Sequence, residues 1–130
     1  MRRDVAVLLA VVVVGLVVQR STAQPLDTVM RQKLEHAQRV LAAIVVEDFT
    51  TVEAAATALG RLTEASGWSV LRSPEYVGHS ADFLRATQAL ADAARQRSID
   101  AAALEYVNVT LKCVQCHKYV RGARLATRMP

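Results

Sequence analysis

The sequence predicts an all-α protein that folds as an antiparallel four-helix bundle. Four stretches place apolar residues three and four positions apart, which is the spacing that gives a helix one buried face. No stretch alternates apolar and polar residues for long enough to predict a strand. The links after the first and third stretches are short, and short links join helices that lie side by side and antiparallel.

The first helix is expected from Pro25, which suits a first helical position, to about Glu47. Its expected inward side is Leu26, Met30, Leu34, Ala37, Leu41 and Ile44. The second helix is expected to begin at the capping box of Thr50 and Glu53. Its expected inward side is Val52, Ala55, Ala56, Leu59 and Leu62. Gly60 lies inside this helix, where glycine costs about 1 kcal/mol of helix stability relative to alanine. Either a neighbouring helix approaches closely at this position, or the glycine has no structural role.

Residues 67–79 show no helical periodicity and are expected to form the one long connection, which Trp68 and Tyr76 pin to the bundle. Ser80 is expected to cap a third helix over residues 81–97. Its expected inward side is Phe83, Ala86, Thr87, Leu90 and Ala94.

A fourth helix is expected to follow Ser98, whose side chain can cap it. Its expected inward side includes both cysteines of the chain and a histidine. The residues of that side are Ile99, Ala102, Ala103, Tyr106, Val109, Thr110, Cys113, Cys116, His117 and Val120.

The block Cys113-Val114-Gln115-Cys116-His117 matches C-x-x-C-H, the attachment signature of a c-type haem. The two thiols add to the haem vinyl groups as thioethers, and the imidazole binds the iron as proximal ligand. On a helix, Cys113, Cys116 and His117 project from one face because they lie three and four positions apart. We therefore expect one covalently attached haem c that forms part of the bundle core.

Other uses of a C-x-x-C pair are weaker here. A thioredoxin-like redox pair usually follows a strand, and no strand pattern precedes Cys113. A zinc site needs a second pair of ligands at motif spacing, and the chain has no other cysteine. The alternative is that Cys113 and Cys116 form a disulfide or remain unmodified thiols.

Residues 1–23 are expected to be an export signal. Arg2 and Arg3 form the positive start, residues 5–18 the apolar run, and residues 21–23 the small residues at the cleavage site. The run is shorter than the roughly 18 residues expected of a membrane span, so a retained anchor is the weaker interpretation. Export agrees with haem attachment, because bacteria attach haem covalently outside the cytoplasmic membrane, so we expect the periplasm.

Cleavage leaves residues 24–130, enough for one domain with one core. That part carries 13 basic and 11 acidic residues, so it is nearly neutral, and its charge gives no argument for nucleic acid binding. No phosphate-binding glycine loop, serine nucleophile motif or acid-base pair is found, so an enzyme is not expected.

The start of the first helix lies beside the end of the fourth in an up-down-up-down bundle. Met30 is expected there opposite His117, and its thioether would be the sixth ligand of the iron. The plain alternative is that Met30 only packs in the core. Met129 lies beyond the fourth helix, His36 is expected to be solvated, and His79, at the end of the connection, is a weak rival.

On these residues the chain resembles the cytochrome c′ family, the class II c-type cytochromes, over essentially all of residues 24–130. The residues that carry the resemblance are Cys113, Cys116, His117, Arg121 and Trp68. The position of the motif near the C-terminus is the discriminating feature, since class I cytochromes carry it near the N-terminus. The chain departs from the usual C-x-x-C-H-x-x-Tyr-Arg ending by having Val120 in place of the tyrosine and Tyr119 one position earlier.

The resemblance implies one of two functions. Members with a methionine from the first helix on the iron are six-coordinate, low-spin and look like electron carriers, and Met30 favours that group. Members with an apolar residue over the iron are five-coordinate and bind nitric oxide or carbon monoxide. A third hypothesis, thiol redox chemistry at Cys113 and Cys116, requires that no haem is attached.

The leading expectation is a soluble periplasmic carrier of one electron. After Glu105 the chain has no acid but five bases, which are Lys112, Lys118, Arg121, Arg124 and Arg128. This cationic end can dock an acidic surface of a periplasmic redox protein, and it can equally stabilise the helix dipole and neutralise the propionates. The resemblance also admits a homodimer, although the outer faces of the expected helices show no clear second apolar stripe.

Overall fold

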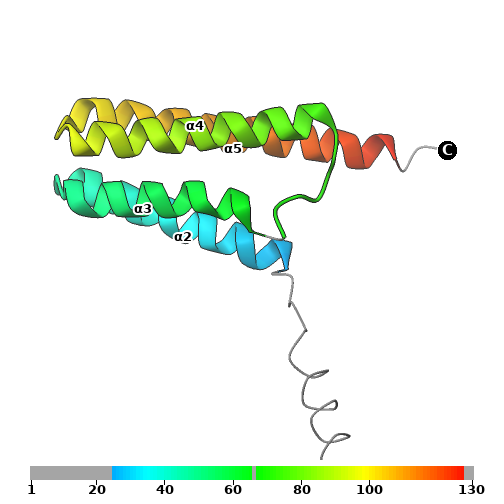
Figure 1. Cartoon of the computed structure of the whole chain (residues 1–130), viewed down its shortest axis with the longest axis horizontal. Helices are drawn as coiled ribbons and strands as arrows, with labels where there is room; N and C mark the ends of the chain where they lie inside the picture. The colour runs from blue at the N-terminus through cyan, green and yellow to red at the C-terminus, as the bar shows by residue number, and fades with distance from the viewer. Residues whose placement is uncertain (1–24, 66, 128–130) are drawn as a thin grey trace, which may run out of the picture.

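The computed structural model describes residues 25–65 and 67–127, which form the helices shown in Figure 1. They are α2 (Leu26–Val45), α3 (Phe49–Arg61), α4 (Pro74–Arg95) and α5 (Ile99–Ala126), with a 3₁₀ turn at Leu62–Glu64. No strand occurs in the described residues, so the prediction of an all-α helical bundle is confirmed. The expected export signal at residues 1–23 and the rival ligand Met129 lie outside the described residues.

The helices are arranged as two pairs, α2 with α3 and α4 with α5 (Figure 1). The start of α2 and the last part of α5 lie at the same end of the bundle, the right-hand end in that view. None of the described helices is long and apolar enough to cross a membrane.

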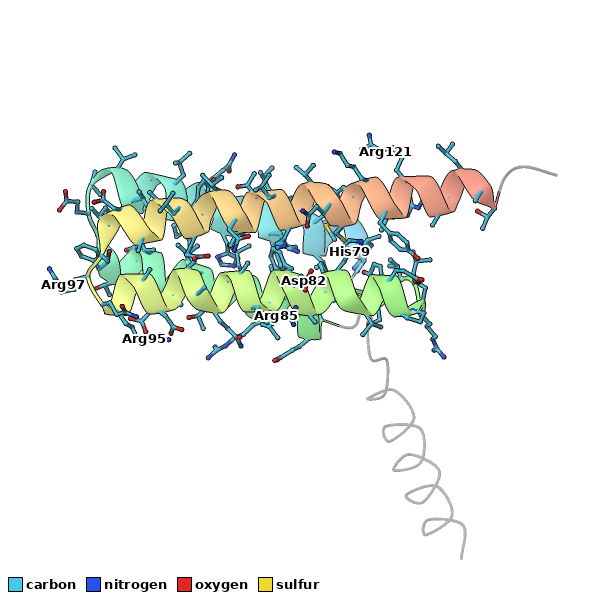
Figure 2. The ribbon with its side chains drawn as sticks, turned by 90° about the horizontal axis from the view of Figure 1, so that it is seen from above. His79, Asp82, Arg85, Arg95, Arg97 and Arg121 are labelled. Atoms are coloured by element: carbon cyan, nitrogen blue, oxygen red, sulfur yellow. The ribbon has the colours of Figure 1, made fainter. Side chains whose placement is uncertain are left out.

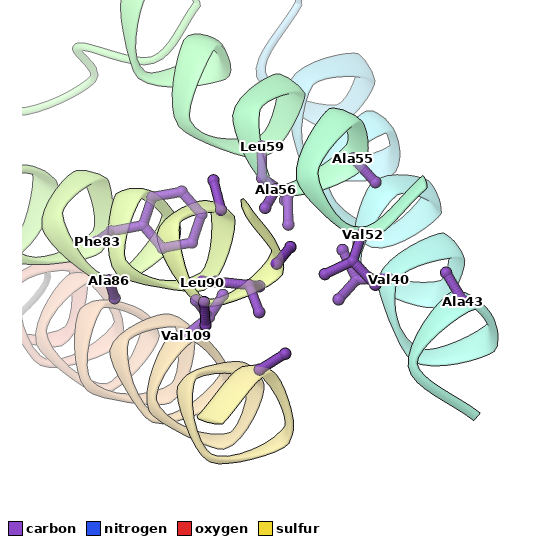
Figure 3. Close-up of a cluster of buried hydrophobic side chains, with 14 residues drawn as sticks. Val40, Ala43, Val52, Ala55, Ala56, Leu59, Phe83, Ala86, Leu90 and Val109 are labelled. Carbon is purple, nitrogen blue, oxygen red and sulfur yellow. The ribbon is translucent and has the colours of Figure 1, made fainter. Parts of the chain in front are cut away.

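The core lies where the two helix pairs face each other, as the close-up in Figure 3 shows. Val40 and Val52 come from one pair and Leu90 and Val109 from the other, and each is at most 1 % exposed. Full burial of side chains of this size contributes about 1.5–3 kcal/mol each. The inward sides expected for the second and third helices are confirmed, except that Leu62 follows α3 and is half-buried.

The cap of α3 differs from the prediction. Asp48, not Thr50, precedes the helix, and its carboxylate accepts a hydrogen bond from the Thr51 N–H at 3.1 Å. Glu53, expected to complete a capping box, instead forms an ion pair with Arg95 of α4 at 3.1 Å. The Thr51 hydroxyl also donates to this carboxylate, at 2.6 Å, and that side-chain hydrogen bond is the main cause of the lowered pKa of Asp48.

α4 begins at Pro74, about two turns before the expected start. Ser73 rather than Ser80 is its cap, and the Ser73 hydroxyl accepts a hydrogen bond from the Tyr76 N–H at 3.2 Å. Proline at the first helical position needs no hydrogen-bond partner for its nitrogen, so the Ser-Pro pair starts a helix well. The long connection is therefore shorter than predicted, and His79 lies inside α4.

α2 buries a different side from the one predicted. Its buried residues are Val29, Lys33, Val40 and Ala43, whereas Leu34 and Leu41 of the expected row are 59 % and 48 % exposed. Both rows have helical spacing, and a step of one residue turns the helix by about 100°. The sequence favours the row without a lysine, but the packing of α2 selects the other.

α5 also carries an apolar row that the sequence analysis does not anticipate. Leu104, Val107, Leu111 and Val114 follow one another three or four positions apart, and all are between 43 % and 72 % exposed. The expectation that the outer faces lack a second apolar stripe is therefore wrong. Of the expected inward row, Ala102, Val109 and Cys116 are buried.

Gly60 lies where α3 and α4 approach each other closely. A Cβ atom at this position would lie 2.8 Å from Thr87 Oγ1 and 3.2 Å from Leu84 Cδ1. The lack of a side chain at Gly60 therefore permits the close packing of α3 against α4. Gly78, in α4, has open space where a Cβ would point.

We predict that Gly60→Ala lowers the free energy of unfolding by about 1–3 kcal/mol, because the methyl group overpacks the contact with Thr87. Gly78→Ala is the matched control, and it should raise the free energy of unfolding by about 0.5–1 kcal/mol through helix propensity. Urea denaturation followed by circular dichroism measures both. Equal effects of the two substitutions would contradict the close approach.

Candidate haem-binding cavity

A cavity of about 470 Å³ lies between α2 and α5, at the end of the bundle where α2 begins. α2 and α5 contact each other far less than the other neighbouring helices do, so protein side chains do not fill the space between them. The walls are mainly apolar and include Leu26, Leu34, Phe83, Tyr106, Val109 and Val120. The volume falls in the range of about 300–1,000 Å³ that is typical of small-molecule sites.

The structure brings the four predicted site residues together, because all of them line this cavity. Cys116 is buried, Cys113 is half-buried and His117 is exposed at the rim, all three on α5. Met30 is half-buried on α2, the opposite wall. Two thiols, an imidazole and a thioether thus surround one apolar space.

These residues fit a covalently attached haem. The donor set supplies two thiols for thioether bonds on one face of α5, an imidazole one position farther on and a sulfur ligand across the cavity. Leu34, on the cavity wall, is 59 % exposed although it belongs to an apolar row. A flat apolar group between α2 and α5 would cover such residues and fill the space.

Aromatic residues close the cavity at the connection between α3 and α4. Trp68 is 3 % exposed, and its indole N–H donates to Ser80 Oγ at 3.0 Å. The Tyr76 hydroxyl donates to the Trp68 carbonyl oxygen, and the Phe83 ring lies 6.1 Å from the Trp68 ring. Trp68 and Tyr76 thus pin the connection to the bundle, as the sequence predicts.

Lys33 is the cavity residue that the sequence analysis misses. Its side chain is buried, with Nζ 3.3 Å from the centre of the Phe83 ring and 4.0 Å from that of Trp68. Such contacts contribute up to about 2 kcal/mol, less than the cost of burying an unpaired ammonium. Burial lowers the pKa of Lys33 to about 8. Its place three residues after Met30, on the same helix face, is the signal that could have found it.

The two thiols lie in surroundings that suppress their reactivity. Burial raises the pKa of both Cys113 and Cys116, and the nearby positive charge of Lys33 only partly opposes this. Reactive thiols in redox enzymes have the opposite shift, towards a lower pKa. The environment therefore gives no support to thiol redox chemistry.

The two rival histidines do not line the cavity. His79 is half-buried in α4 and its ring lies 5.3 Å from that of Tyr119, but it does not line the cavity. The sequence predicts a solvated His36, yet its Nδ1 is buried and has no hydrogen-bond partner among the described residues. Within the described residues, no three histidine, cysteine or acidic side chains form a group that could hold a metal ion.

Comparisons with known proteins do not assign a family. No family model matches the chain, and no curated protein and no solved structure matches it either.

Tyr119 connects the motif-bearing part of α5 to the start of α4. A hydrogen bond of 2.6 Å joins its hydroxyl to that of Ser73, the cap of α4. This contact fixes the position of the connection that carries Trp68, and so it contributes to the shape of the cavity.

We predict that Tyr119→Phe lowers the free energy of unfolding by about 1 kcal/mol, because it removes one partly buried hydrogen bond. Tyr106→Phe is the matched control, since the Tyr106 hydroxyl makes no hydrogen bond within the described part of the chain. Urea denaturation of the exported protein measures the free energy of unfolding of both variants. A larger loss for Tyr106→Phe would contradict the role given to Tyr119.

Proposed function

We propose that the chain is an exported monohaem c-type cytochrome of the cytochrome c′ type, which carries one electron in the bacterial periplasm. The observation that supports this most strongly is that Cys113, Cys116, His117 and Met30 line one apolar cavity between α2 and α5. The same cavity is large enough for a small-molecule cofactor and is not filled by side chains.

When bound, the haem supplies an iron that takes up and releases one electron. Cys113 and Cys116 would hold the haem edge to α5 through thioether bonds. His117 would hold the iron from the same helix, and Met30 would hold it from α2. Because both iron ligands come from packed helices, neither has to move far when the charge on the site changes.

The aromatic wall supports this role by excluding water. Trp68, Tyr76 and Phe83 are all at most 4 % exposed, and they lie on one side of the cavity. A dry surrounding and a methionine ligand both favour the reduced, less positive form of the iron and raise the reduction potential. His117 is exposed at the rim, so one edge of the haem would lie close to the surface for electron transfer.

The last part of α5 is the surface that we propose for docking an electron-transfer partner. Lys118, Arg121 and Arg124 are exposed there, and Figure 2 shows Arg121 on the side of α5 away from α4. No acidic residue follows Glu105 in the chain. Such a surface would attract an acidic redox protein to the exposed haem edge.

We predict that the oxidised exported protein has a low-spin absorption spectrum with the weak methionine-to-iron band, and that carbon monoxide leaves the reduced protein unchanged. Met30→Ala should lose that band and keep the haem, because only the sulfur ligand is removed. Leu34→Ala, on the same wall of the cavity, is the control and should keep the band.

A high-spin wild-type spectrum that shifts promptly with carbon monoxide would contradict the carrier function and favour gas binding. The absence of any haem spectrum, from a cell competent in cytochrome c maturation, would contradict the whole proposal.

We also predict that the pair Arg121→Gln and Arg124→Gln slows electron transfer to a purified acidic redox protein several-fold at low salt. The difference should shrink as salt screens the charges. The pair Arg95→Gln and Arg97→Gln removes the same charge from the opposite end of the bundle (Figure 2) and is the control. Stopped-flow measurements of the electron-transfer rate across a range of ionic strength test this prediction. Equal slowing of electron transfer by both pairs of substitutions would exclude docking at α5.

A further inference from the structure

Lys33 is a buried ammonium without an ionic partner. It is 9 % exposed in a mainly apolar cavity, and its Nζ rests on the faces of Phe83 and Trp68. The ion pairs within the described part of the chain involve arginines, so no carboxylate compensates Lys33 there. A buried charge of this kind destabilises a fold, so its presence inside a cofactor cavity points to a functional role.

The position of Lys33 places it on the distal wall. Met30 and Lys33 are three residues apart on α2, so they project from neighbouring positions of one helix face, and both line the cavity. Lys33 lines the same cavity as Cys113 and Cys116, and its positive charge acts on both thiols. Its four-carbon stem gives the nitrogen the reach and freedom to reorient.

The two thiols indicate which part of a haem the amine would meet. Thioether bonds form at the vinyl edge of the macrocycle, and the propionates lie at the opposite edge. An amine that shares the cavity with both cysteines would therefore meet the vinyl half of a bound haem rather than its propionates. A salt bridge with a propionate is accordingly disfavoured, and the place of Lys33 beside Met30 on α2 favours contact with the iron.

We propose that Lys33 is a second distal ligand, whose amine takes the sixth position on the oxidised iron whenever Met30 leaves it. This inference rests on the proposed haem function. In the exchange the bond from the Met30 sulfur to the metal breaks, a bond from Lys33 Nζ forms, and the ammonium releases one proton to solvent. The oxidation state of the iron does not change in this step.

The two ligands have different preferences. The thioether is soft and favours the reduced metal, whereas the harder amine favours the oxidised metal. If Lys33 binds whenever Met30 leaves, the oxidised iron stays six-coordinate. Small ligands such as nitric oxide then find no free coordination position. Met30 and Lys33 together would thus favour electron transfer over gas binding at this site.

The test compares oxidised proteins in a Met30→Ala background at one fixed pH, by absorption and electron paramagnetic resonance spectroscopy. Met30→Ala alone should stay low-spin, with a nitrogen ligand in place of sulfur. Adding Lys33→Leu should convert the protein to a high-spin form. Adding Lys33→Arg should do the same, because the guanidinium keeps the charge but cannot be deprotonated to bind a metal.

Lys112→Leu in the same background is the matched control. Lys112 also lines the cavity, but its Nζ is directed to Gln115 Oε1 at 3.5 Å, so its removal should leave the protein low-spin. A Met30→Ala protein that is already high-spin would overturn the inference, and so would a low-spin state that survives Lys33→Leu and Lys33→Arg. Because every variant is read from its haem spectrum, loss of the haem itself would count against the proposed function instead.

Lys33→Leu should not prevent folding, since it replaces a buried unpaired charge with an apolar side chain of similar volume. As a second readout, the oxidised wild type should show a weaker methionine-to-iron band than Lys33→Leu alone, in proportion to the fraction of molecules ligated by Lys33.

Discussion

The sparse contact between α2 and α5 is the constraint on which the rest of this structure depends. The other neighbouring helices pack closely around a core of small side chains, and at Gly60 even one methyl group would be too large. Protein interiors are normally filled to the density of organic crystals, whereas here an apolar space of about 470 Å³ lies between the helices and leaves Leu34 on its wall largely exposed. A cofactor attached to α5 and contacted by α2 would supply the missing packing and hold the two helix pairs together at this end.

The connection between α3 and α4 shapes the wall of that space. Trp68 is held by Ser80 and Tyr76, and Tyr119 ties the cap of α4 to the motif-bearing helix. These contacts link one side of the cavity to the segment that carries the thiols. Lys33 then introduces a positive charge into otherwise apolar surroundings, where its Nζ rests on the rings of Phe83 and Trp68.

Much of the fold and of the candidate site follows from local patterns. Helical spacing predicts the four helices and the buried rows of α3 and α4, and the C-x-x-C-H block identifies the residues that prove to share a cavity. Capping is harder to predict, because Asp48 and Ser73 compete with equally suitable neighbours. The buried row of α2 is not predicted, because a row with a lysine is not expected inside, and the rings that the lysine contacts, Trp68 of the connection and Phe83 of α4, come from other parts of the chain.

The most direct test of the central claim is the mass of the peptide that contains residues 113–117, taken from protein exported by a cell competent in cytochrome c maturation. The account predicts that this peptide carries one haem, and that substituting either Cys113 or Cys116 with alanine removes one of its two thioether bonds. A peptide with the mass of the bare sequence, whether its thiols are free or joined as a disulfide, would contradict the account.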